Sequence, residues 1–319
     1  MRIVVLGAGA VGSLIGAMLH RAGEDVVLVG SPAHVEAIRA GGLRIEGRLE
    51  GTFAIAAETR LAPGTSTDLV WFTVKTFDLA RATEQAAREL PGSIPWVLAQ
   101  NGLGVEEVAR AALRSAGRVA DPDRWLVRAV NTIPATLVAP GIVRQPGDGE
   151  IRLADPNHAG TSGPSVRLVA ASLLRAGVPV RFVPDIDRAA WRKAVVNAAI
   201  NPVTAEHDIL NGQLLQDPWR TEATILLLEA LSAARLAGYD FSLEELERDL
   251  WETIRATAGN RSSMLQDVDR GRPTEIDSIS GYLLDTARRH SVTLPATERI
   301  VERIRRRTAS ASHPRQQRS

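Results

Sequence analysis

The sequence predicts an α/β domain, with a parallel sheet covered by helices on both faces, followed by an all-α domain. Three observations predict this. Short apolar runs alternate with helical segments in the first half of the 319-residue chain. Nearly every segment from 188 to 307 has a helical pattern, and the change falls at "PDID" (184–187). We expect a first domain over 1–184 and a second over 185–319, in which 308–319 lacks an apolar face and is predicted to be a disordered tail.

The first domain alternates buried strands with amphipathic helices. Strands are expected at 2–7, 25–30, 68–75 and 94–102. Helices are expected at 12–23, 34–42 and 78–90, with a hairpin in 43–58. The segment 125–154 has a strand pattern throughout, and a helix over 162–177 and a strand over 178–183 follow it. In the second domain the helices are expected at 188–200, 218–238, 242–258 and 274–290.

The composition excludes several classes of protein. The net charge is +1, so nothing indicates a nucleic-acid partner. The chain has no cysteine, which excludes disulfides and thiolate metal sites, and we expect no metal site. No apolar run reaches the length of about 20 residues that a membrane helix needs. The N-terminus resembles a signal peptide, but its apolar run contains four glycines and has no small-residue cleavage site before Glu24, so we expect a cytoplasmic protein.

The segment "GAGAVG" (7–12) has the G-x-G-x-x-G spacing and lies between a predicted strand and a predicted helix. This is the context of a Rossmann-type dinucleotide-binding loop. Gly7 would permit the tight turn, Gly9 the approach of a pyrophosphate, and Gly12 close packing of helix on strand. The N–H groups of the helix N-terminus would bind the phosphates. The predicted cofactor-binding loop comprises Gly7, Ala8, Gly9, Ala10, Val11 and Gly12.

The residues that follow three of the predicted strands are candidates for contact with the cofactor. An acid at the end of the second strand would favour NAD, but Gly30 and Ser31 stand there. No arginine is placed to hold a 2′-phosphate; Ser31, His34 and Arg39 are the nearest candidates, and the alternative is that each is an ordinary surface residue. Lys75 and Asn101 follow two later strands, at the carboxyl ends where ligands bind, although exposed lysines at strand ends are also common without a ligand. A turn role for Asn101, in the pair Asn-Gly, is compatible with this.

The segment "WRKAVVNAAINPVTA" (191–205) carries Lys193, Asn197 and Asn201 at every fourth position of an otherwise apolar sequence. On a helix these side chains share one face. Burying them without partners would be costly, and small-molecule sites often lie at domain boundaries, so we interpret the face as the floor of a cleft. Pro202 is expected to end or kink the helix at Asn201.

Two further segments combine polar residues with helix signals. "GNRSSMLQD" (259–267) places an asparagine, an arginine and two serines before an apolar pair. In "GRPTEIDSISGYLL" (271–284), Thr274 is predicted to cap a helix, with Asp277 three residues on. Glu275 would then lie in the first turn, where its pattern-based role is to complement the helix dipole.

Together, "WRKAVVNAAINPVTA", "NRSSMLQDV" and "PTEIDSISGYLL", preceded by "GAGAVG" and "NGLG", resemble the ketopantoate reductases (2-dehydropantoate 2-reductases) over residues 1–307. The resemblance implies a Rossmann domain, an all-helical domain, an active site between them, and reduction of ketopantoate to D-pantoate by NADPH on the way to pantothenate and coenzyme A. It implies that Lys193 is the general acid and Glu275 a supporting carboxylate. It also implies substrate contacts from Asn197, Asn201, Asn260 and Ser263, and nicotinamide contacts from Lys75 and Asn101.

One departure from the family pattern concerns the cofactor. The resemblance implies NADP(H) as the cofactor. The family commonly has an arginine where this chain has Ser31, and because that arginine is missing, NAD(H) stays open. The expected partner is a small 2-oxo acid, with neither nucleic acid nor membrane, and a homodimer is compatible with the sequence. Two alternatives remain: a reductase of another branched 2-oxo acid, and a non-catalytic NAD(P)-binding sensor, which would be expected to lack Lys193 or Glu275.

Overall fold

The computed structural model describes residues 1–117 and 121–311, and these form two compact units. The first unit comprises residues 1–100 and 104–189. The second comprises residues 101–103 and the chain from Ala190 onward. The division therefore falls five residues after the predicted boundary at 184/185, and the sequence did not indicate that 101–103 belong with the second unit.

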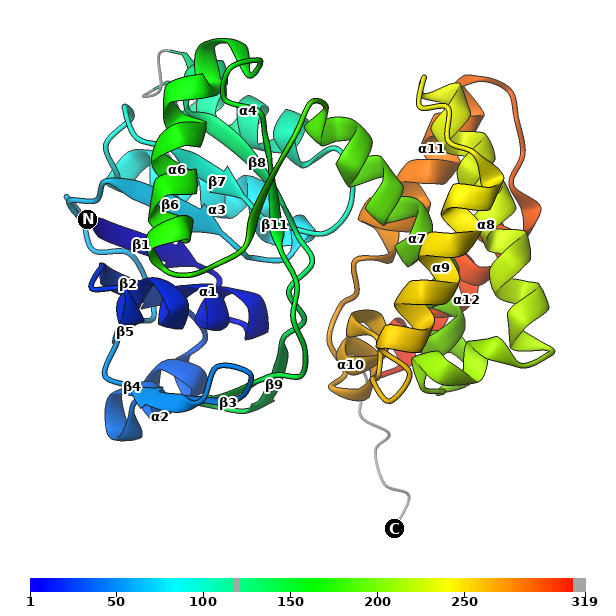
Figure 1. Ribbon diagram of the computed structural model, residues 1–319, viewed down its shortest axis with the longest axis horizontal. Coiled ribbons are helices and arrows are strands. Elements are labelled where there is room, and N and C mark those ends of the chain that lie inside the picture. The colour runs from blue at the N-terminus through cyan, green and yellow to red at the C-terminus, as the bar shows by residue number, and fades with distance from the viewer. Residues whose placement is uncertain (118–120, 312–319) are drawn as a thin grey trace. The chain divides into compact units, whose positions relative to one another are not determined.

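An eight-stranded sheet forms the centre of the first unit, in the order β12-β11-β8-β7-β6-β1-β2-β5 (Figure 1). Neighbouring strands are parallel except for the antiparallel pair β8 and β11. The predicted parallel sheet is thus confirmed, apart from this one antiparallel pair, which was not predicted. Its strands are β1 (Arg2–Leu6), β2 (Asp25–Val29), β5 (Ala56–Glu58), β6 (Leu69–Phe72), β7 (Trp96–Leu98), β8 (Leu126–Asn131), β11 (Ile151–Ala154) and β12 (Val180–Val183).

A smaller sheet has the order β4-β3-β10-β9. Its members β3 and β4 are antiparallel and form the hairpin predicted in 43–58, whereas β5 from the same segment joins the main sheet beside β2. Strand β10 pairs with β3 in parallel, and β9 pairs with β10 antiparallel. The strands are β3 (Leu43–Gly47), β4 (Gly51–Phe53), β9 (Thr136–Ala139) and β10 (Ile142–Gln145).

Helices cover both faces of the main sheet because successive strand residues point to opposite sides. In β1, Val5 packs in one apolar cluster with residues of α1 and α6, and Val4 packs in another with residues of α3 and α4 (Figure 1). Helix α4 was not predicted from the sequence. The helices and turns of this unit are α1 (Ala10–Arg21), α2 (Pro32–Gly41), η1 (Thr76–Asp78), α3 (Leu79–Glu89), α4 (Val105–Ala116), α5 (Pro122–Trp125), η2 (Gly160–Ser162) and α6 (Gly163–Arg175).

The second unit is helical, with α8 packed against α9, α11, α12 and η3. A short π-helical turn labelled η4 leads directly into α11. None of the described helices is long and apolar enough to cross a membrane. The elements are α7 (Ile186–His207), which begins in the first unit, η3 (Asn211–Leu215), α8 (Trp219–Leu236), α9 (Leu243–Ala256), α10 (Ser263–Asp269), η4 (Asp277–Gly281), α11 (Tyr282–Arg289) and α12 (Pro295–Ala311).

Two predictions about helix ends were wrong. Of the two effects expected of Pro202, an end or a kink at Asn201, the end does not occur, because α7 continues through Pro202 to His207. Helix α12 extends to Ala311, so residues 308–311 are helical rather than part of a disordered tail. The remaining residues of the predicted tail, 312–319, lie outside the described residues.

Candidate active site

The glycine-rich loop after β1 turns tightly against the end of β6. Gly7 has a φ of 101°, and a Cβ added to it would lie 2.3 Å from the backbone nitrogen of Val74. A Cβ on Gly12 would lie 2.4 Å from both the carbonyl oxygen of Gly7 and Oγ1 of Thr73. The Thr73 hydroxyl donates to the carbonyls of Leu6 at 3.2 Å and Gly7 at 2.9 Å. The close approach of the loop to the end of β6 therefore requires glycine at position 7, and the packing of α1 on both requires it at position 12.

The middle glycine of the loop has open space beside it. A Cβ on Gly9 would have only the Gly7 carbonyl oxygen within 4 Å, at 3.9 Å. Gly9 precedes α1, and its carbonyl accepts from the Ser13 N–H at 3.0 Å. The N–H groups of Ala10 and Val11 come before this bond, in the turn where helical amides lack partners within the helix. An open face beside N–H donors and a helix N-terminus is suited to a pyrophosphate.

Ser31 is exposed just after β2, immediately before α2. Its side chain makes no capping hydrogen bond to that helix. In the strand order of the main sheet, β2 lies between β1 and β5. Ser31 therefore follows the neighbour of β1, the strand that leads into the glycine-rich loop. Arg39, on α2, donates from Nε to the Ala57 carbonyl at 2.8 Å and forms an ion pair with Glu58.

His34 is buried, so its interpretation as a surface residue was wrong. Its Nδ1 accepts from the Gly141 N–H at 2.9 Å, and its Nε2 lies 2.9 Å from Oγ of Ser13. Because Nδ1 acts as an acceptor, the proton of the neutral ring is on Nε2. Burial lowers the pKa of His34, which favours this neutral form. A neutral ring with both nitrogens engaged inside the unit is not suited to bind a phosphate.

Lys75 and Asn101, the two strand-end residues, belong to different units. Lys75 is half-buried and follows Val74, the residue that approaches Gly7. Its carbonyl accepts from the Asp78 N–H at 3.0 Å, which closes the turn η1. Lys75 therefore lies near the glycine-rich loop in the first unit, whereas Asn101 belongs to the second.

Asn101 contacts the lysine of the α7 face directly. The Lys193 Nζ donates to Oδ1 of Asn101 at 2.8 Å. The residues that follow Asn101 pack on η4: the Leu103 N–H donates to the Ser278 carbonyl at 2.9 Å. Gly102 has a φ of 94°, and a Cβ there would lie 2.7 Å from the same carbonyl oxygen. The backbone contacts on η4 thus fix the amide that holds the Lys193 ammonium.

The other members of the α7 face are the two predicted asparagines. Asn197 is half-buried and Asn201 is buried, at 6% exposure. Both lie on the face of α7 that carries Lys193, because the three residues are four apart. The Asn201 carbonyl accepts from the Thr204 hydroxyl at 3.0 Å. The helix therefore brings one ammonium and two amides together, as the spacing predicted.

Glu275 is buried, at 7% exposure, and lies two residues before η4, with Ile276 between them. Its carbonyl accepts from the Ser278 hydroxyl and from the Ile279 N–H, both at 3.1 Å. The predicted cap was wrong, because the Thr274 hydroxyl is buried and has no hydrogen-bond partner among the described residues. Turns of the π type are frequent at functional sites. Glu275 and the 101–103 segment are thus attached to one such turn.

Asn260 lies between α9 and α10, and Ser263 is the first residue of α10. Asn260 is half-buried, and its carbonyl accepts from the Asn211 N–H at 3.0 Å. Ser263 is exposed and begins α10, which Ser262 caps by accepting from the Leu265 N–H at 3.1 Å. This segment is attached to the residues that follow α7. No role for Ser262 or its neighbour Arg261 was predicted from the sequence, although both belong to the polar run in "GNRSSMLQD".

The chain combines a Rossmann-type unit that carries a glycine-rich loop with a helical unit that carries Lys193, Asn197 and Asn201 on one helix face. The family model described as "Ketopantoate reductase PanE/ApbA" matches residues 3–158, and the model of its C-terminal part matches residues 185–308. The chain belongs to the ketopantoate reductase family.

Individual relatives agree with this assignment. The 2-dehydropantoate 2-reductase of Pyrococcus horikoshii is 34% identical over 297 residues, which cover 92% of this chain and 93% of the relative. That of Archaeoglobus fulgidus is 32% identical over 307 residues, covering 95% and 97%. The crystal structure of a family member from Ralstonia eutropha JMP134 matches with a TM-score of 0.86 and 27% identity, covering 98% of this chain and all of that one. D-mandelate dehydrogenase with NADH and anilino(oxo)acetate shares the fold, with a TM-score of 0.88 at 22% identity.

Proposed function

We propose that this chain reduces 2-dehydropantoate to D-pantoate with NADPH, a step towards pantothenate and coenzyme A. The observation that carries the proposal is the Lys193 ammonium, held 2.8 Å from the Asn101 amide on a helix face that also bears Asn197 and Asn201. The identity of 30–34% to relatives named 2-dehydropantoate 2-reductase supports the choice of substrate.

The first unit supplies most of the groups that would hold the cofactor, and the second unit supplies Asn101. The backbone of the loop Gly7–Gly12 and the N-terminus of α1 would bind the pyrophosphate, and the open face at Gly9 supports this assignment. Ser31 would meet the adenosine ribose, because it follows the second strand. Lys75 and Asn101 are assigned to the nicotinamide end. When bound, the reduced nicotinamide supplies the hydride.

Lys193 is proposed to act as the general acid. Addition of a hydride to the keto carbon forms a C–H bond and moves the carbonyl electron pair onto oxygen. An ammonium beside that oxygen stabilises the developing charge and then transfers a proton to it, which gives the alcohol. Asn101 accepts a hydrogen bond from Nζ of Lys193 and so restrains the position of the proton donor. We propose that the carboxylate of the buried residue Glu275 supports the substrate site.

Polar residues of the second unit are proposed to bind the substrate's carboxylate and hydroxyl. The Ser263 hydroxyl can donate to the carboxylate, and amide side chains both donate and accept, as a hydroxyl partner must. A site that hydrogen-bonds a hydroxyl discriminates strongly against analogues that lack it. The three amides assigned to this task are those of Asn197, Asn201 and Asn260.

Alanine substitution of the three amides is expected to change substrate selectivity. In Asn197→Ala, Asn201→Ala and Asn260→Ala, kcat/KM should fall more for ketopantoate than for an analogue without the terminal hydroxyl, because the lost partner matters only where that hydroxyl exists. Steady-state kinetics with both substrates measure the difference. Equal losses for the two substrates would show that the amides have a structural role.

The substitution Ser31→Arg is expected to shift cofactor preference towards NADPH by about 10-fold or more, since hydrogen bonds to charged groups contribute about 1.5–3 kcal/mol. A guanidinium can hold the 2′-phosphate bidentately, whereas the exposed Ser31 offers one hydroxyl. The effect should appear in the KM of the cofactor rather than in kcat. Measuring kcat/KM for NADPH and NADH in both proteins tests it, and an unchanged ratio would show that Ser31 does not face the ribose.

The proposed function is tested by mixing the purified chain with NADPH or NADH and a panel of 2-oxo acids, and following the absorbance of the reduced nicotinamide. Rapid loss with ketopantoate, and slow loss with other acids, is expected. Preference for another branched 2-oxo acid would reassign the substrate. Binding of NADPH without turnover of any acid would favour the non-catalytic sensor.

A further inference from the structure

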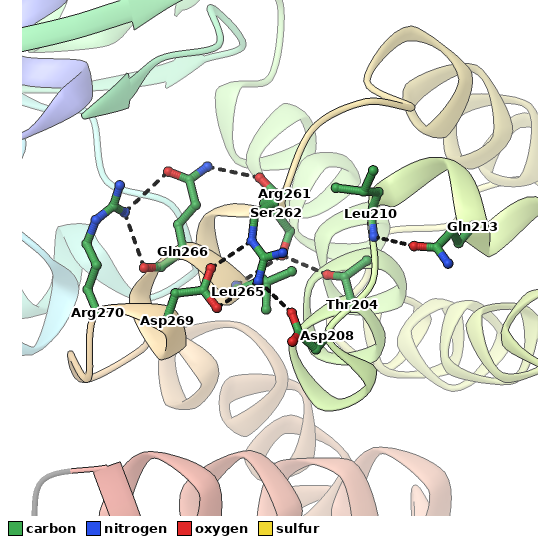
Figure 2. A network of polar contacts seen from close by, with 10 residues as sticks. All are labelled: Thr204, Asp208, Leu210, Gln213, Arg261, Ser262, Leu265, Gln266, Asp269 and Arg270. Atoms are coloured by element: carbon green, nitrogen blue, oxygen red, sulfur yellow. Dashed lines mark hydrogen bonds and ion pairs between the residues drawn. The ribbon is translucent and has the colours of Figure 1, made fainter. Parts of the chain in front are cut away.

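We propose that Arg261 is a positioning residue that holds the segment 258–263, and with it Asn260 and Ser263, in place for the substrate. The inference rests on the proposed function, which assigns those two residues to substrate binding. Figure 2 shows the Arg261 side chain between two carboxylates, Asp208 and Asp269, that come from different helices' ends.

One guanidinium connects the end of α7 with the end of α10. Arg261 donates from Nε and Nη2 to the two carboxylate oxygens of Asp269, each at 2.7 Å, and Asp269 is the last residue of α10. The same Nη2 lies 2.5 Å from Oδ1 of Asp208, the residue directly after α7. The hydrogen bonds to these carboxylates raise the pKa of Arg261 above its usual range, so the guanidinium stays charged.

Neighbouring contacts attach the same segment to the region after α7. The N–H groups of Asn211 and Gly212 donate to the carbonyls of Asn260 and Ala258, both at 3.0 Å. The backbone carbonyl of Arg261 also accepts from the Gln266 side chain at 2.9 Å, which links the segment to α10 (Figure 2). The position of Asn260 therefore depends on how the segment lies against residues 208–212.

A buried hydroxyl pair relates the segment to the α7 face. The Thr204 hydroxyl, on α7, lies 2.7 Å from that of Ser262, and both residues are buried (Figure 2). Thr204 also bonds to the carbonyl of Asn201, so the helix turn that carries Asn201 contacts the residue between Arg261 and Ser263. This set of contacts thus connects three parts of the sequence: α7, residues 208–212 and the segment 258–263.

The exposure of the ion pairs indicates that their main effect is on position. The side chains of Arg261, Asp208 and Asp269 are 39%, 56% and 36% exposed. Ion pairs this exposed contribute little to global stability. Residues 258–262, in contrast, precede α10 and are held by these ion pairs and the few hydrogen bonds described above, so a small shift of Asn260 or Ser263 would weaken substrate binding.

The substitution Arg261→Gln tests the proposal, with Arg288→Gln as the matched control. Arg288 also joins two exposed carboxylates, Asp285 at 3.3 Å and Glu298 at 3.2 Å, in the same unit. In Arg261→Gln, the KM of the 2-oxo acid should rise about 5- to 20-fold, the span of one or two weak charged contacts, with kcat and cofactor affinity within about twofold of wild type. Arg288→Gln should leave all three unchanged.

Two further measurements separate positioning from general loss of stability. Hydrogen exchange of the amides of residues 211 and 212, followed by mass spectrometry, should become faster in Arg261→Gln, because their acceptors belong to the segment. Asp208→Asn should have an intermediate effect: Asp208 has a φ of 55°, and asparagine tolerates this conformation as aspartate does, so the substitution removes charge without adding strain.

The proposal is overturned if Arg261→Gln leaves both the KM and the exchange unchanged, if Arg288→Gln has the same effect, or if the loss appears in kcat alone. Failure of the proposed function gives a different result: wild type would then prefer another 2-oxo acid to ketopantoate, or turn over none. In that case the exchange at residues 211 and 212 decides whether Arg261 holds the segment.

Discussion

Replacing Lys193 with alanine is expected to lower kcat about 100- to 10,000-fold, the usual contribution of a positioned general acid. Alanine at this position removes both the proton donor and the charge that stabilises the developing alkoxide. The fold should persist, because Lys193 is half-buried on α7 and its apolar neighbours Ala194 and Val195 supply the packing. Stopped-flow or steady-state assays with saturating cofactor and 2-oxo acid measure the loss.

Arg192→Ala provides the control for this prediction. Arg192 precedes Lys193 on the same helix and is bound instead by Asp249, with Nη2 2.9 Å from Oδ1. Its removal deletes a cation of similar length and should leave kcat within about twofold, since Arg192 has no part in the proton transfer. NADPH affinity, followed by fluorescence, should be unchanged in both variants. Turnover above about a tenth of wild type in Lys193→Ala would remove this residue from the mechanism.

The second large effect is expected at the glycine-rich loop, where Gly9→Ala should fold normally and bind NADPH at least about 10-fold more weakly, in line with the loss of a charged hydrogen bond. The added Cβ meets only the Gly7 carbonyl oxygen, at 3.9 Å, so the protein without cofactor accommodates it. The same methyl group would occupy the face where the pyrophosphate is proposed to approach. Thermal unfolding and a fluorescence titration with NADPH measure the two properties separately.

Gly7→Ala is the comparison, because it should destabilise the protein itself. The new Cβ would lie 2.3 Å from the backbone nitrogen of Val74, and φ at this position is 101°. Backbone strain of about 1–3 kcal/mol and overpacking of about 1–3 kcal/mol should together lower the melting temperature clearly. Unchanged NADPH binding by Gly9→Ala would show that the dinucleotide does not contact this face of the loop.

The architecture could be predicted because its signals are local. Buried parallel strands such as "RIVVL" and "DVVLV" are almost wholly apolar, and the glycines of "GAGAVG" mark the turn between strand and helix. Likewise, the four-residue spacing of Lys193, Asn197 and Asn201 is a property of one helix, so the sequence was sufficient to place them on one face.

What the sequence could not show depends on contacts with distant residues. Pro202 suggested a helix end, since a proline inside a helix costs about 3 kcal/mol. The helix continues because the next turn packs in the interior: Val203 and Ala205 are fully buried. The burial of His34 was equally hidden, because the group that donates to its ring belongs to Gly141, 107 residues away.

The membership of residues 101–103 in the second unit has a consequence for building hybrid enzymes. A chimera that joined the N-terminal half of one family member to the C-terminal half of another at a single crossover near residue 189 would combine a foreign Asn101 loop with the native η4 turn. The contacts at risk are the Leu103 N–H bond to Ser278 and the tight fit of Gly102 on the same carbonyl. A hybrid designed to exchange substrate specificity should therefore take residues 101–103 and the helical half from the same family member.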